Sequence, residues 1–178
     1  MRQIHRKALA LGLVLALSAC GGDPEPRFEE DPSPAPSEVT TSAPVKEAWE
    51  EKSDDGAIAF VEHWVDEFNQ MQTTGEVNDF RQLGTPNCAA CDNFVDITRD
   101  IYEEATVESK GWSIEAADVP RGQSGSARDI SVQIQQAPET ITYEDGRVER
   151  NDGGQLTVVM TTRWAGDTWQ MDSVEFPS

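Results

Sequence analysis

Cys88 and Cys91 are separated by two alanines, and this C-x-x-C pair could serve more chemical roles than any other motif in the sequence. Such a pair can form a structural disulfide, act as a thiol–disulfide redox centre, or give two ligands to a metal. Thioredoxin-like redox centres place the motif after a strand, whereas helical patterns precede it here. Zinc usually takes four ligands, and the chain beyond residue 20 adds only His63 and carboxylates. We predict a structural disulfide, with the redox and metal roles as alternatives, and no cofactor.

The third cysteine, Cys20, closes the sequence Leu-Ser-Ala-Cys after a basic start and an apolar run at positions 8–17. This pattern is typical of a lipobox, where signal peptidase cuts ahead of a lipid-modified cysteine. The run is too short to cross a bilayer, which needs about 20 apolar residues. We predict a signal peptide at 1–19 and a lipid on Cys20 that anchors the protein to the extracytoplasmic face of the cell membrane.

The composition is strongly acidic, with 33 Asp and Glu against 14 Lys and Arg and a net charge of −19 over 178 residues. Such a charge disfavours nucleic acid as a partner, because phosphate binding usually needs a basic face. Residues 20–53 are rich in Pro, Glu, Ser and Thr and have no apolar period, which predicts a disordered stalk. Residues 54–178 are enough for one globular domain with its own core.

Three helices are expected in the first half of that domain. The first begins at Asp54-Asp55 and ends at Thr73-Thr74-Gly75, with apolar residues recurring every three or four positions. A short second helix is expected at Val77 to Leu83. The third is expected to start at Thr85-Pro86, to bury Phe94, Ile97, Ile101 and Ala105, and to stop at Lys110-Gly111.

After Gly111 the apolar period changes to two, which predicts strands near 112–116, 130–134, 141–143, 156–164 and 169–176. Asp145-Gly146 indicates a two-residue hairpin turn. Trp169 and Met171 are out of phase with Val174 and Phe176, so we expect a β-bulge near Asp172-Ser173. Helices followed by strands predict an α+β fold with an antiparallel sheet of about four to five strands covering the helices.

This layout resembles the cone of the nuclear-transport-factor-two-like superfamily, in which a long first helix lies across the concave side of a curved sheet. It also resembles an uncharacterised family of lipoproteins from high-GC Gram-positive bacteria. The second resemblance depends on the lipobox, the stalk, the Phe-Val-x-x-Trp helix, the Thr-Pro-Asn-Cys-Ala-Ala-Cys segment and a closing strand with Trp169. It implies no established activity.

Enzymes of that superfamily hold an acid, a His or a Tyr inside an apolar cone, where burial tunes the pKa. The candidates here are His63, Tyr102, Asp100 and Asp118, each of which also has an ordinary structural interpretation. The sequence has no G-x-S-x-G, H-E-x-x-H or phosphate-binding glycine loop.

We therefore predict a non-enzymatic binding or accessory domain that receives a small apolar ligand or a protein partner. A cone enzyme acting on a small apolar substrate, or a purely structural module, is the alternative. The aromatic residues expected around a ligand cavity are Trp64, Phe68, Trp112 and Trp164. If these side chains fill the cone, ligand and substrate are both disfavoured.

Overall fold

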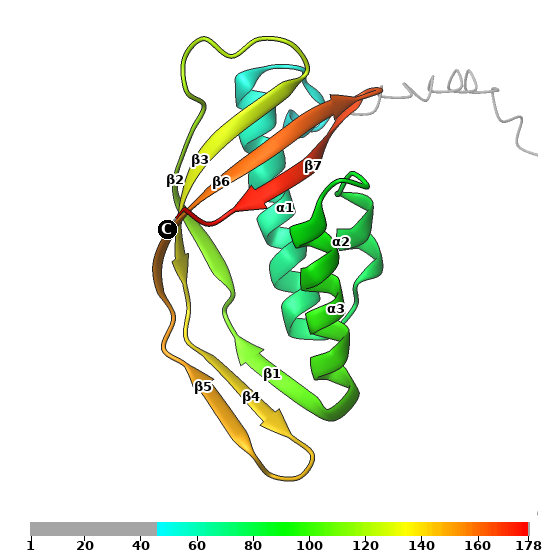
Figure 1. Cartoon of the computed structure of the whole chain (residues 1–178), viewed down its shortest axis with the longest axis vertical. Helices are drawn as coiled ribbons and strands as arrows, with labels where there is room; N and C mark the ends of the chain where they lie inside the picture. Colours follow the sequence, from blue (N-terminus) through cyan, green and yellow to red (C-terminus); the bar gives the residue numbers. More distant parts are fainter. Residues whose placement is uncertain (1–45, 178) are drawn as a thin grey trace, which may run out of the picture. The chain divides into compact units, whose positions relative to one another are not determined.

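The structure is a computed structural model that describes residues 46–177 (Figure 1). The predicted signal peptide, Cys20 and most of the predicted stalk lie outside the described residues. The elements in chain order are η1 (Ala48–Glu50), α1 (Asp54–Thr74), α2 (Asn78–Gln82), α3 (Ala89–Glu104), β1 (Ala105–Ser109), β2 (Trp112–Asp118), β3 (Ala127–Gln136), β4 (Glu139–Tyr143), β5 (Val148–Asn151), β6 (Gly154–Ala165) and β7 (Thr168–Glu175).

The α+β class is confirmed, and so are the first two helices. The Ser53 hydroxyl caps α1 by accepting a 2.9 Å hydrogen bond from the Gly56 amide. Gly75 ends α1 in the left-handed conformation with φ of 76°. The predicted apolar stripe of α1 is buried in the core, with Trp64 fully enclosed. The helix α2 lies within one residue of its expected ends.

The expectations for the third helix were wrong at both ends. It begins at Ala89 with Cys88 as its N-cap, and Thr85-Pro86 lie in the preceding turn. It ends at Glu104, because Ala105 to Ser109 leave the helix to pair with β4. Ile97 was expected in the core, but 47% of its surface is exposed.

The strands form two antiparallel sheets, a four-stranded one in the order β2-β3-β6-β7 and a three-stranded one in the order β1-β4-β5. The expected count of four to five strands was therefore too low, because β1 and β5 were missed. All four residues of β5 are exposed, so no apolar alternation marks that strand in the sequence. The predicted bulge is confirmed, since Thr161 pairs with Ser173 and Thr162 with Met171, which leaves Asp172 as the extra residue.

The two sheets continue into one another across a single line of strand breaks, which we call the crease. It contains Gly111 between β1 and β2, Ala137 between β3 and β4, and Gly153 between β5 and β6. The Ala137 amide donates a 2.9 Å hydrogen bond to the Gly111 carbonyl. A Cβ atom on Gly153 would overlap the Gln136 carbonyl oxygen, so the backbones meet closely there.

The helices lie together on one side of the sheets, and α1 and α3 both pack directly against strands (Figure 1). Aromatic rings dominate the core around α1. Trp64 lies 4.9 Å from Phe80, and Phe68 lies 4.4 Å from Trp112, between ring centroids. The ring of Phe94 on α3 contacts the same group in edge-on geometry. We call these five residues the aromatic cluster.

The fold begins before residue 54, inside the segment that the sequence assigned to the stalk. The Trp49 ring in η1 stacks on the His63 ring of α1 at a centroid distance of 4.3 Å. The Trp169 indole donates a 2.8 Å hydrogen bond to the Glu51 carbonyl. These contacts attach residues 48–51 to both α1 and β7.

Candidate functional site

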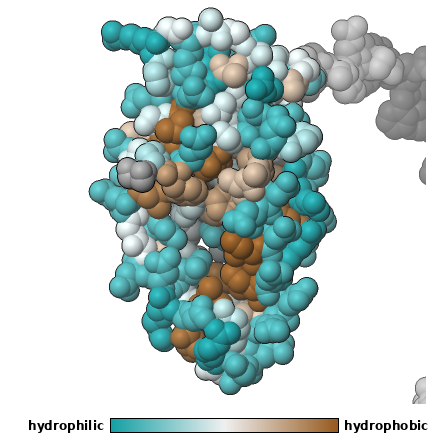
Figure 2. Space-filling view, viewed as in Figure 1, coloured by the Kyte–Doolittle hydropathy of each residue, from teal (hydrophilic) through white to brown (hydrophobic). Residues whose placement is uncertain are grey.

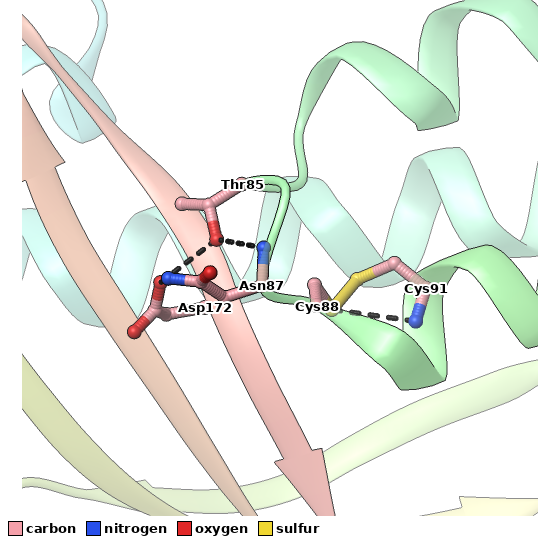
Figure 3. Close-up of a disulfide and its surroundings, with 5 residues drawn as sticks. All are labelled: Thr85, Asn87, Cys88, Cys91 and Asp172. Atoms are coloured by element: carbon pink, nitrogen blue, oxygen red, sulfur yellow. Dashed lines mark hydrogen bonds between the residues drawn. A yellow bond between two sulfur atoms is a disulfide. The ribbon is translucent and has the colours of Figure 1, made fainter.

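The Cys88–Cys91 disulfide spans the first turn of α3 (Figure 3). Both residues are buried, with 1% and 5% of their surface exposed. The Cys91 amide donates to the Cys88 sulfur at 3.3 Å, so this sulfur also caps the helix. Thiol–disulfide exchange needs a thiolate to reach a sulfur atom. Burial of both residues therefore favours the structural role of the pair over the redox role.

A polar network beside the disulfide ties the preceding loop to the bulge of β7 (Figure 3). The Asp172 carboxylate accepts hydrogen bonds from the Thr85 hydroxyl at 2.7 Å and the Asn87 amide at 3.4 Å. It also accepts one from the Arg163 guanidinium at 2.9 Å. The bond from Arg163, followed by that from Thr85, lowers the pKa of Asp172. These bonds join the loop before α3 to β6 and β7, so we interpret the network as structural.

Replacing both disulfide cysteines by alanine is expected to lower the free energy of unfolding by about 2 kcal/mol, the loop-closure entropy of so short a ring. The fold should persist, because the core and the Asp172 network remain. Urea unfolding of Cys88→Ala/Cys91→Ala beside the unaltered chain measures the loss. Reductant should lower the midpoint of the unaltered chain and leave that of the double variant unchanged. A double variant as stable as the oxidised chain would contradict the structural role.

A cleft between α3 and the β1–β4 pair is the site that combines apolar walls with ionisable groups. It encloses about 100 Å³. We call it the α3 cleft, and Figure 2 shows apolar side chains gathered beside a hollow on this face of the molecule. Its lining residues are Phe68, Gln72, Phe94, Ile97, Thr98, Ile101, Tyr102, Val107 and Glu139.

Two ionisable side chains, Glu139 and Tyr102, lie in this cleft. The Tyr102 hydroxyl donates a 2.9 Å hydrogen bond to the Gln72 carbonyl. Burial, and then the nearby Glu139, raises the pKa of Tyr102. Burial also raises the pKa of Glu139. Within residues 46–177, no hydrogen bond or ion pair engages the Glu139 carboxylate.

Of the four candidate catalytic residues, the structure places only Tyr102 at the cleft. His63 stacks on Trp49. Asp118 is exposed at the end of β2, and Asp100 is exposed on α3. The arrangement therefore brings no His–acid or acid–acid pair from that set into one place.

The four expected cavity residues divide into two groups. Trp64, Phe68 and Trp112 belong to the aromatic cluster, which fills the space between α1 and the four-stranded sheet, and Phe68 alone also lines the cleft. Trp164 is half-buried elsewhere, edge-on to Trp169 at 5.3 Å. Beside the packed cluster, the open volume that Phe68 and Phe94 line is the α3 cleft.

Sequence reasoning missed Glu139, although a signal for it exists. Glu139 shares its alternation phase with Ile141 and Tyr143, so an acid occupies the face of β4 that otherwise carries partly buried apolar and aromatic side chains. A carboxylate in that phase, directly after Pro138, is the pattern that marks the site.

Glu139→Gln is expected to raise the free energy of unfolding at neutral pH by about 0.5 kcal/mol, a value kept small because the side chain is half exposed. The folded pKa of Glu139 lies above its unfolded value. The penalty for ionisation is therefore absent below the unfolded pKa, develops as the pH rises through the folded pKa, and is constant above it. Urea unfolding between about pH 3.5 and pH 7.5 should show the gain appear with rising pH. Glu108→Gln, an exposed neighbour on β1, should show no such trend.

A family model described as "Family of unknown function (DUF6318)" matches residues 41–175 of the chain. No curated protein matches it significantly. Among solved structures, it resembles the intermembrane space region of the chloroplast protein ARC6, at 8% identity over 72% of this chain and 98% of that chain, with a TM-score of 0.51. At that identity the likeness concerns the fold alone.

Two further structures are more distant. The Kfla4162 protein from Kribbella flavida is 11% identical over 70% of this chain and 91% of that chain, with a TM-score of 0.47. A protein named Rd1NTF2_05 with five substitutions is 10% identical over 68% of this chain and 99% of that chain, with a TM-score of 0.37.

Proposed function

The chain belongs to the family of unknown function DUF6318, and from this premise we propose that it is a lipid-anchored, extracytoplasmic binding protein. The lipid sits on Cys20, and the domain receives a ligand or partner group in the α3 cleft. The observation that carries the binding role is the cleft itself, which places one unpaired carboxylate among apolar side chains.

The proposed location is supported by the sequence around Cys20 and by the buried disulfide. Disulfides form and persist mainly in oxidising compartments such as the outer side of the cytoplasmic membrane. Among residues 46–177, no helix has both the length and the apolar character that crossing a bilayer requires. A lipid with two acyl chains would give stable attachment without a spanning helix.

The state of Tyr102 favours binding over catalysis, and the size of the cleft restricts either role to a small chemical group. Sites for drug-sized molecules usually enclose about 300–1,000 Å³, whereas this cleft encloses about 100 Å³. The Tyr102 hydroxyl is bonded to the Gln72 carbonyl, and its pKa is raised, so it stays protonated at neutral pH. A phenol in that state is poorly matched to proton transfer near pH 7.

The location is tested by growing cells with a labelled fatty acid and following the chain. We expect the label on the unaltered chain and its complete loss in Cys20→Ser, with the protein leaving the membrane fraction. Cys88→Ala/Cys91→Ala should keep the label, because only Cys20 lies in the lipobox. An unlabelled, uncleaved chain in the cytosol would overturn the proposed extracytoplasmic location.

The binding role is tested by a thermal-shift screen of the full chain, because a ligand that binds only the folded state raises the melting temperature. The matched control is Val107→Trp, which fills the cleft from β1. A compound that stabilises the unaltered chain and not the filled variant supports binding in the α3 cleft. If a compound stabilises both proteins equally, its binding site lies outside the α3 cleft.

A second candidate function is catalysis on a very small substrate, favoured by the meeting of Glu139 and Tyr102 in one cleft. A carboxyl group with a raised pKa suits a general base. The two functions separate when a stabilising compound is recovered after incubation. Binding leaves it unchanged, whereas catalysis converts it, and Glu139→Gln would then stop the conversion.

A further inference from the structure

We propose that the α3 cleft binds a primary alkylammonium group, with the Glu139 carboxylate as its counter-ion and the surrounding apolar side chains holding its methylene chain. The inference rests on the proposed binding role of the cleft and names the chemistry that the cleft selects.

The sheet register sets which groups face the cleft. Glu139 pairs with Ser109 on β1 and with Asn151 on β5, so these three side chains form one row on the same face of the three-stranded sheet. The next row on that face contains Val107, Ile141 and Glu149, and the cleft includes Val107. The cleft wall on this sheet therefore carries a carboxylate and no basic side chain.

Among residues 46–177, the basic side chains nearest to Glu139 in the chain form no ion pair with it. Arg147 pairs with Glu149, and its guanidinium lies 3.5 Å from the Tyr143 ring centre. Arg150 pairs with Thr140, one position out of phase with Glu139. It lines a neighbouring pocket together with Glu139, but no ion pair joins the two side chains. The helices α1 and α3 contribute no charged side chain to the cleft lining. In the part of the chain that the structure describes, no Lys, Arg or His side chain forms an ion pair with Glu139.

An alkylammonium group satisfies both features of the cleft. Its three N–H donors can form charge-assisted hydrogen bonds to a carboxylate that folding has already partly removed from water. Its methylenes can contact Phe94, Ile97 and Ile101, and Ile97 is a large aliphatic side chain left 47% exposed. An anion of the same length would be repelled, and a neutral alcohol would leave the carboxylate without a counter-charge.

The volume limits the length of the ligand. A cleft of about 100 Å³ is small beside the roughly 300–1,000 Å³ of sites for drug-sized molecules, so it suits a chain of a few atoms. Butylammonium and the end of a lysine side chain share this size and chemistry. The first would be a free amine, and the second would belong to a partner protein.

The test uses the detergent-solubilised full chain and follows the methyl resonances of Ile97, Ile101 and Val107 by NMR during titration. Butylammonium, butanol and butyrate are the probes, matched in length and differing in charge. Because a five-atom ligand has a low affinity ceiling, we expect a dissociation constant near the millimolar range for butylammonium. Butanol should bind about tenfold more weakly and butyrate not measurably.

Glu139→Gln should weaken butylammonium binding by about tenfold or more. Glu108→Gln removes the same charge from the opposite face of β1 and should change binding less than about twofold. Binding to the unaltered chain should weaken as the pH falls through the raised pKa of Glu139, because protonation removes the counter-ion.

A second titration, with N-acetyl-lysine methylamide, distinguishes a free amine from the lysine side chain of a partner protein. Binding of both amines points to a protein-borne lysine, and binding of butylammonium alone to a free amine.

Equal binding of butanol and butylammonium, or an unchanged affinity in Glu139→Gln, overturns the ammonium inference and leaves an apolar binding role in place. Absence of binding by all three probes overturns the inference, and a thermal-shift screen without a cleft-dependent ligand then also removes the proposed function. The two failures therefore give different results.

Discussion

Trp64→Ala is expected to lower the free energy of unfolding by about 3–5 kcal/mol, the usual cost of truncating a large aromatic residue in a core. Trp64 has no exposed surface and contacts Phe68, Phe80 and Phe94 within the aromatic cluster. Its removal leaves a cavity that joins three helices. A loss of this size is a large part of the 5–15 kcal/mol that stabilises an ordinary domain. Urea unfolding measured by far-UV circular dichroism tests it.

Two variants separate cavity formation from other effects of losing this tryptophan. Trp64→Phe keeps a ring and removes an indole N–H that has no partner among the described residues, so it should cost less than half as much. Trp164→Ala truncates a half-buried tryptophan outside the aromatic cluster and should also cost less. Equal losses for Trp64→Ala and Trp164→Ala would show that the cluster does not dominate stability.

Gly111→Ala is expected to cost about 3 kcal/mol, because it combines backbone strain with the loss of a contact between α1 and the crease. Gly111 has φ of 72°, a conformation that costs alanine about 1–2 kcal/mol. The new Cβ atom would overlap the Asn69 side-chain oxygen. That amide accepts a 2.7 Å hydrogen bond from the Trp112 N–H and donates a 2.8 Å bond to the Trp112 carbonyl.

Gly125→Ala is the matched control for Gly111→Ala. Gly125 also has a positive φ, of 90°, but a Cβ atom there would meet nothing within 4 Å. It should therefore show the backbone strain alone, about 1 kcal/mol. The difference between the two denaturation midpoints measures the Asn69 contact. If the two variants are equally stable, this contact contributes nothing to joining α1 and the sheet.

The sequence was informative wherever a local pattern determined a local structure. The stripe and the two ends of α1 are read from neighbouring residues, and the bulge at Asp172 follows from a change of phase within a few positions. By contrast, Ala105 to Ser109 form a strand only because β4 lies beside them, 30 or more residues later in the chain. Periodicity in one segment cannot reveal a partner strand, so α3 was expected to run on.

The candidate site also combines features set by a local pattern with features set by distant parts of the chain. The disulfide was predicted from the C-x-x-C spacing and from the predicted extracytoplasmic location, and the structure contains it. The α3 cleft was not predictable, because it exists only where α3 leaves the sheet wall incompletely covered. Ile97 fits a helical stripe by spacing, yet it lies at this opening. Glu139 became a candidate only when the register of β4 placed it beside Tyr102.

The crease gives the two sides of the α3 cleft different mechanical properties. On one side, the aromatic cluster joins α1 to α3, and the disulfide closes the first turn of α3. On the other side, the β4–β5 hairpin has no fully buried residue, and β5 is a bare edge. Amide protons of β4 and β5 should therefore exchange with solvent through openings of lower free energy than those of β3 and β6. The β4–β5 hairpin is therefore the more deformable wall of the α3 cleft. Its bending at the crease, which contains Gly111, Ala137 and Gly153, would change the width of the cleft entrance.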